Sequence, residues 1–188
     1  PKPHFTTKKA IINYKQNNIS TIEQLKIYVS LENLFSLKNI KINNLIIQNA
    51  NFNVNKSNYN FFVQLLNNNF LNNNLIIENS NIFFENKENE ILFINKILEL
   101  KYYYDVNELK NILISKNEIF NMPYAIRIFN DKKQNKFISK LKLNSLKLQL
   151  ESEYNYKNEV KTGKIDLISN KSKSIINYKL NKKFLEFD

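Results

Sequence analysis

Few residues of this chain have side chains that could catalyse a reaction or hold a metal ion. His4 is the only histidine and cysteine is absent, which removes Ser/His and Cys/His nucleophile pairs and histidine- or thiolate-based metal sites. The single glycine, Gly163, cannot supply a glycine-rich phosphate cradle. We therefore expect a protein that is not an enzyme and that needs no metal and no cofactor.

Carboxylates and a run of tyrosines are the remaining candidates for chemistry. Glu85, Glu88 and Glu90 lie in a turn-like, asparagine-rich stretch, where we expect a solvated loop rather than an acid and base pair. The tyrosines at 102–104 could stack on bases or sugars. Aromatic residues are equally favoured in strands for cross-strand packing, which is the role we expect here.

The net charge of +11 raises nucleic acid or another polyanion as a partner. The composition offers a different reason for this charge, because 36 asparagines and 27 lysines stand beside a single arginine, as is typical of an A+T-rich genome. Nucleic-acid binders also prefer arginine for bidentate contacts, and Arg127 is alone. We expect no nucleic-acid partner, and a basic β-domain that binds nucleic acid or anionic glycan is the alternative.

An internal repeat is the strongest organisational signal. The segments 43–54 and 73–84 begin with ten positions of which seven are identical. Each copy has an apolar strand, an Asn-small-Asn break that predicts a bend or bulge, and a second short strand, since asparagine tolerates left-handed backbone in a protein with almost no glycine. Stacked repeats predict that residues 45–47 and 75–77 occupy equivalent places in one sheet.

Three short segments have helical spacing. In 58–66, Phe61, Phe62, Leu65 and Leu66 follow an asparagine that could cap a helix. The segments 30–35 and 107–114 have similar patterns. We expect two or three short helices.

The second half of the chain has plainer β alternation. Residues 124–129 form one strand, and two apolar sets follow that the alternation assigns to different faces: Phe137, Leu141 and Leu143, then Leu146, Leu148 and Leu150. The phase changes at Asn144-Ser145, which predicts a bulge or a tight bend. Gly163 lies inside a strand-like stretch and predicts another bulge.

These patterns predict a mainly β fold in which residues 1–188 form one unit. We expect a long antiparallel curved sheet, a repeat-like meander or groove, with the short helices at its margin. Several strands are apolar on both faces, so that a face not used for the core needs a partner or a lipid. The candidates for lipid contact are Ile47, Phe52, Ile77, Ile82, Phe84, Leu146, Leu148 and Leu150.

The order of motifs between residues 29 and 121 resembles the AsmA-like family of bacterial envelope proteins. The likeness consists of a Ser-Leu-x-x-Leu-Phe turn, an Ile-x-x-Leu-x-Ile strand, a helix that begins at an asparagine, and a second strand with an asparagine bend, found here at 29–35, 42–47, 60–66 and 75–82. Phe61 stands where the family usually has Trp, and Ser80-Asn81 stands where it often has Asn-Gly.

The resemblance implies a periplasmic module of a longer, inner-membrane-anchored protein, built from long antiparallel strands that curve into a groove. Members are linked to outer-membrane homeostasis and, in the larger ones, to bridge-like phospholipid transfer. The implied partners are lipid or membrane and neighbouring repeats of the same chain; no catalytic residues are implied. The sequence starts at Pro1 without a leader and has no apolar run near the ~18 residues of a membrane span, so we expect a soluble segment with its anchor outside it.

Overall fold

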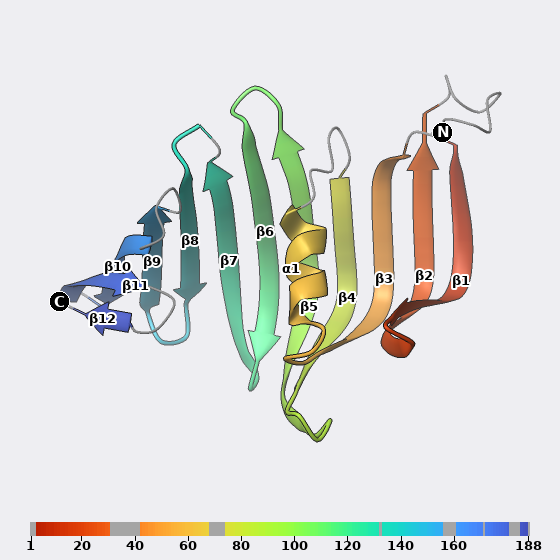
Figure 1. Ribbon diagram of the computed structural model, residues 1–188, viewed down its shortest axis with the longest axis horizontal. Helices are drawn as coiled ribbons and strands as arrows, with labels where there is room; N and C mark the ends of the chain where they lie inside the picture. The colour runs from red at the N-terminus through yellow and green to blue at the C-terminus, as the bar shows by residue number, and fades with distance from the viewer. Residues whose placement is uncertain are drawn as a thin grey trace.

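A computed structural model shows a mainly β protein whose strands follow one another in chain order across one curved, unclosed sheet (Figure 1). The structure describes residues 3–30, 42–67, 74–131, 133–155, 161–170, 172–180 and 185–187. Within them the sheet has 12 strands, and the predicted fold class is confirmed. The strands are β1 (His4–Tyr14), β2 (Asn17–Val29), β3 (Ile42–Val54), β4 (Asn74–Glu85), β5 (Ile91–Asp105), β6 (Lys110–Ile119), β7 (Met122–Asp131), β8 (Lys136–Leu143), β9 (Leu148–Asn155), β10 (Lys161–Ser169), β11 (Ser172–Leu180) and β12 (Leu185–Phe187).

One strand pair departs from the antiparallel pattern. β3 and β4 are parallel, and the chain between them contains the helix α1 (Tyr59–Asn67). A parallel pair needs a crossover connection, whereas antiparallel neighbours can be joined by a tight turn. The helix expected over 58–66 is therefore confirmed, and it provides the crossover.

The two repeat copies are β3 and β4, paired in register so that Leu45 lies beside Leu75 and Ile47 beside Ile77. The prediction that the copies occupy equivalent places in one sheet is confirmed. Equivalent side chains lie next to each other, and the paired asparagines form an amide ladder, as in stacked in-register strands. Its hydrogen bonds run from Asn74 Nδ2 to Asn44 Oδ1 (3.2 Å) and from Asn81 Nδ2 to Asn51 Oδ1 (3.0 Å). Between them, Gln48 Nε2 donates to the carboxylate oxygen Oε2 of Glu78 (2.6 Å).

The alternation of side chains is interrupted at the same level in β1, β3 and β4. Lys9, Asn49 and Asn79 have positive φ angles of 58°, 52° and 48°, and the pairing between neighbouring strands skips each of them. The irregularity predicted at the Asn-small-Asn breaks is confirmed. The second short strand predicted after each break is not separate, since β3 and β4 each continue through it as one strand. Buried residues on its two sides, such as Ile47 and Ala50, are three positions apart instead of two.

The interruption ends at β5. A register shift between Ile97 and Glu99 absorbs one residue against β6, which is a β-bulge. β6 then keeps regular alternation, with Leu113, Ser115 and Asn117 all buried. The skipped positions therefore form one line across β1 to β5 and do not reach the second half of the sheet.

The core lies between α1 and the first half of the sheet. Phe62 of α1 packs against the buried cluster and meets the ring of Phe52 edge-on, with centroids 6.3 Å apart. Figure 1 shows α1 in front of the sheet, and we call this side the helix side and the opposite side the outer face. The buried cluster consists of Ile22, Ile47, Ala50, Phe52, Leu75, Ile77, Ile97, Tyr102 and Leu113.

The loop into α1 is held by asparagine side chains. Asn55 Oδ1 accepts hydrogen bonds from the backbone N–H groups of Ser57 and Asn58, at 3.0 and 3.2 Å. The Asn58 amide bonds backward, to Asn55 N–H and to the carbonyl of Asn53. Asn58 therefore ties the loop to β3 rather than bonding forward to the N–H groups of the helix.

One of the predicted helices needs correction. Residues 107–114 are not a helix, because 107–109 form a turn and β6 begins at Lys110. β6 is paired on both sides and has buried residues on both faces, and such a run also fits helical spacing. The segment 31–35 of the third candidate lies outside the described residues.

Gly163 is not at a bulge. Its strand keeps regular register with both neighbours, and the described glycine has no positive φ. A Cβ at this position would lie 2.3 Å from the ring of Tyr178. The glycine therefore makes room for an aromatic ring that lies across it from β11.

The phase change at Asn144-Ser145 is a turn, as predicted. β8 ends at Leu143, a turn occupies 144–147, and β9 begins at Leu148. The assignment of the two apolar sets to different faces is wrong, since the hairpin pairs Leu141 with Leu150 and Leu143 with Leu148. Cross-strand partners share a face.

Replacing Asn79 tests the left-handed bend. Asn79→Ala should lower the free energy of unfolding by about 1 kcal/mol, because a Cβ-bearing residue without a side-chain amide is strained at positive φ. Asn79→Gly should be tolerated. Urea unfolding monitored by circular dichroism measures both, and equal destabilisation by alanine and glycine would contradict a backbone origin.

Candidate functional site

Beyond α1, the helix side continues as a strip of apolar side chains over β7 to β10. Strand pairing places this strip on the same face as the core, because Leu113 of the core pairs with Ile128. On the following strands Ile126 pairs with Leu141, Leu141 with Leu150, and Leu150 with Leu167. All of these strip residues are half-buried. The apolar strip consists of Ile126, Ile128, Phe137, Leu141, Leu143, Leu148, Leu150, Tyr154, Ile165 and Leu167.

The apolar strip has no second layer within the described part of the chain. α1 is the one described helix, and Figure 1 shows it over the first half of the sheet. The strip includes two aromatic rings, those of Phe137 and Tyr154, which stack with their centroids 5.0 Å apart. Ser139 and Ser152 lie on the same face between Ile128 and Ile165, and the rest of this face is apolar. An apolar surface of this extent is typical of a site for an apolar ligand or partner.

Unpaired amides lie at one end of the strip. Asn111 and Asn130 are cross-strand partners on β6 and β7, two positions from the pair of Leu113 and Ile128 on the same face. Asn111 is only 4% exposed, and neither its Nδ2 nor its Oδ1 has a hydrogen-bond partner; the same holds for Asn130 Oδ1. A buried polar atom without a partner costs about 1–3 kcal/mol, and at this depth of burial the atoms offer almost no surface to a ligand.

Three of the predicted lipid-contact residues belong to the core. Ile47, Phe52 and Ile77 are at least nine-tenths buried in the cluster beneath α1. They offer almost no surface to a ligand while α1 is in place. Strand alternation alone does not reveal which face the helix covers.

Two further candidates, Ile82 and Phe84, lie on the helix side of β4. Ile82 is half-buried and packs against the cluster. The ring of Phe84 stacks on Phe93 at 4.4 Å, and Phe93 in turn lies 6.5 Å from the exposed ring of Phe120. These two candidates stand at the β4–β5 end of the sheet, apart from the apolar strip.

The remaining candidates divide between a turn and the strip. Leu146 lies in the turn between β8 and β9 and is 56% exposed, so it does not share a strand face with its predicted neighbours. Leu148 and Leu150 are part of the strip. The strip also contains residues that were not among the candidates, such as Phe137, Leu141 and Tyr154. They lie at even spacings along β8 and β9, and this alternation was the signal that could have identified them.

The outer face is charged, and five ion pairs on it join acids to lysines. Arg127 is exposed on this face, opposite Lys140. The tyrosine run does not form a platform, because Tyr102 is buried in the core while Tyr103 points to the outer face. The ion pairs are Lys101–Glu99 (2.7 Å), Lys136–Glu153 (2.7 Å), Lys140–Glu151 (2.5 Å), Lys164–Asp166 (3.0 Å) and Lys173–Asp166 (3.0 Å).

The ion pairs of the outer face and burial in the core shift the pKa of several side chains. Hydrogen bonds from Lys164 and then Lys173 lower the pKa of Asp166, and Lys101 and Lys116 lower that of Glu99. Burial raises the pKa of Tyr102 to about 12.

The described residues contain no group of three or more His, Cys, Asp or Glu that could hold a metal ion.

Comparisons with known proteins found no match, neither to a protein-family model nor to a curated protein. None of the helices formed by the described residues is long and apolar enough to span a membrane.

The pairing of Asp166 predicts a specific acid sensitivity. Its pKa is lower in the folded than in the unfolded chain, so folding favours the carboxylate; this stabilisation is present above the unfolded pKa and is lost as the pH falls through the folded pKa. In urea unfolding followed from pH 7 to pH 2, Asp166→Asn should lower the midpoint at neutral pH and flatten the decline in acid. Glu88→Gln, in the exposed β4–β5 hairpin, is the control. An unchanged acid decline in Asp166→Asn would contradict this role.

Proposed function

We propose that this chain is a non-enzymatic, lipid-accommodating module of an AsmA-like envelope protein, in which the apolar strip takes up acyl chains. The full-length protein would be anchored in the inner membrane and project into the periplasm, where it would serve outer-membrane homeostasis or phospholipid transfer. The observation that carries the proposal is the half-buried apolar strip over β7 to β10, on a sheet that is one layer thick there in the described ranges.

One further feature supports an apolar ligand. The strip borders the core, since Ile126 and Ile128 pack against the buried cluster, so its geometry is supported by a packed layer. An acyl chain fits such a surface.

The alternative, a basic domain that binds a polyanion, receives less support. The described outer-face acids at 99, 151, 153 and 166 are each in contact with lysine, so positive and negative charge are interspersed there. The tyrosines at 102–104 point alternately to the two faces. A salt series separates the two functions, because binding to a polyanion weakens steeply with salt whereas apolar uptake does not.

Leu150→Asp tests the proposal directly. Leu150 lies between Leu141 and Leu167 at the middle of the strip. A carboxylate there should weaken the uptake of a fluorescent fatty acid by about tenfold. That is the effect expected if two methylenes of the acyl chain are no longer buried, at ~0.8 kcal/mol each. The protein should remain folded because the site is half-buried and open on one side.

Gln149→Asp is the matched control, since it adds the same charge one residue away on the exposed outer face. It should bind like the unchanged protein at low and at high salt. Unfolding of Leu150→Asp would identify the strip as core. Equal uptake by Leu150→Asp and Gln149→Asp, or uptake abolished by salt, would contradict the proposal.

A further inference from the structure

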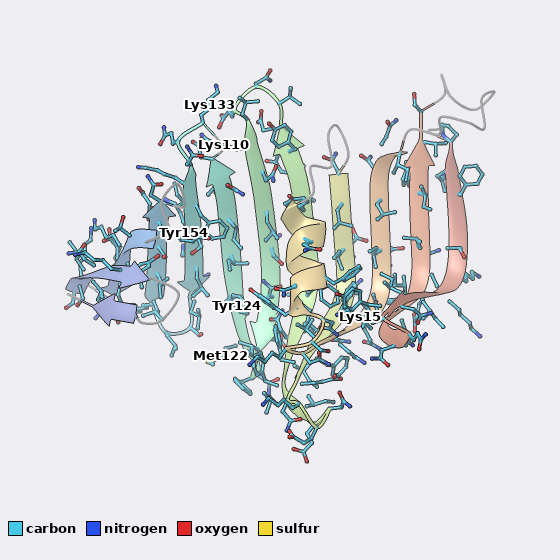
Figure 2. The ribbon with its side chains drawn as sticks, viewed as in Figure 1. Lys15, Lys110, Met122, Tyr124, Lys133 and Tyr154 are labelled. Carbon is cyan, nitrogen blue, oxygen red and sulfur yellow. The ribbon has the colours of Figure 1, made fainter. Side chains whose placement is uncertain are left out.

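A polar pocket of about 400 Å³ lies at one end of the sheet, outside the apolar strip. Three connections form it: the turn between β1 and β2 with Lys15, the loop from β3 into α1 with Asn55, and the β4–β5 hairpin with Asn89. Figure 2 places Lys15 at the end of the sheet where the loop into α1 begins. The volume of the pocket is within the range of small-molecule sites.

The walls of this pocket are held by hydrogen bonds that are already in place. Asn55 and Asn58 cross-link the loop into α1, and Asn58 is only 3% exposed. In the hairpin, Asn86 Oδ1 accepts from the backbone N–H groups of Glu88 and Glu90 at 2.9 and 2.8 Å. A pocket with walls fixed in advance loses less conformational entropy when a ligand binds.

Other polar side chains of the pocket do not take part in the hydrogen bonds that hold its walls. The side-chain amides of Asn17, Asn53 and Asn89 make no hydrogen bond within the described structure, and each offers both a donor and an acceptor. Lys15 and Glu85 add one positive and one negative charge, so the described part of the lining is neutral. Paired donors and acceptors without net charge match the vicinal hydroxyl groups of a sugar.

The asparagine content of the lining exceeds what the composition of the chain provides. Of the eleven lining residues that the structure describes, six are asparagine, against 36 of 188 in the whole sequence. The apolar part of the lining is small, consisting of the buried side chain of Ile19 and the ring of Tyr14. An acyl chain would find little apolar surface there, and an anion would meet the Glu85 carboxylate.

We propose that this pocket binds a neutral saccharide, with the amides of Asn17, Asn53 and Asn89 bonding to its hydroxyl groups and Tyr14 offering apolar surface to its ring carbons. The site is independent of lipid uptake, because the residues that line it share no member with the apolar strip.

The test is a titration of the ¹⁵N-labelled chain with three neutral disaccharides: maltose, cellobiose and N,N′-diacetylchitobiose. At least one should give saturable chemical-shift changes at backbone amides of residues 14–18, 53–58 and 86–89. Asn53→Ala should weaken that binding by roughly fivefold to tenfold, the worth of one hydrogen bond. Asn89→Gly should do the same while keeping the backbone, since Asn89 has a φ of 62° that glycine adopts freely.

Asn177→Ala, an exposed asparagine of β11 outside the pocket, is the control and should bind like the unchanged protein. Thermal unfolding of all variants checks that the loops remain in place. The proposal is overturned if no disaccharide gives saturable shifts, if Asn53→Ala and Asn89→Gly bind normally while folded, or if glucose 6-phosphate binds and the neutral sugars do not.

Discussion

The parallel, in-register pairing of β3 with β4 is the contact on which the rest of the structure depends. A parallel pair requires a crossover, so the chain between the two copies must leave the sheet, and α1 is the segment that does so. The helix then buries one face of the first strands and produces the core with Phe62 and Phe52. The pairing itself is possible because both copies skip a residue at the same place, Asn49 in one and Asn79 in the other. Without that match, one copy would present its polar residues to the helix.

Much of this arrangement could be predicted from the sequence, because it depends on local repetition. The identical positions of the copies at 43–54 and 73–84 indicated equivalent strands, and the two asparagines indicated the bend. The parallel direction was also available, since the predicted helix stands between the copies. We nevertheless expected an antiparallel sheet, and the parallel pair of β3 and β4 departs from it.

The remaining features depend on contacts between distant residues. The segment 107–114 was assigned to a helix because a strand paired on both sides is apolar on both faces. The role of Gly163 depends on Tyr178, which lies opposite it on another strand. For the same reason the candidate site was only partly identified: Ile47 and Leu150 have the same alternation, and the position of α1 makes one a core residue and the other part of the apolar strip.

The skipped residue Lys9 gives the edge of the sheet a property of its own. β1 is the first strand in the sheet order, and it carries the same break in alternation as the repeat copies. A straight strand that docked along β1 would match its hydrogen-bonding groups on one side of Lys9 and fall out of step on the other. Two such edges would also bring the lysine pair at 8–9 of one molecule toward that of another. A strand that pairs with β1 along its whole length therefore needs a break of its own opposite Lys9, or a bulge such as the one between β5 and β6.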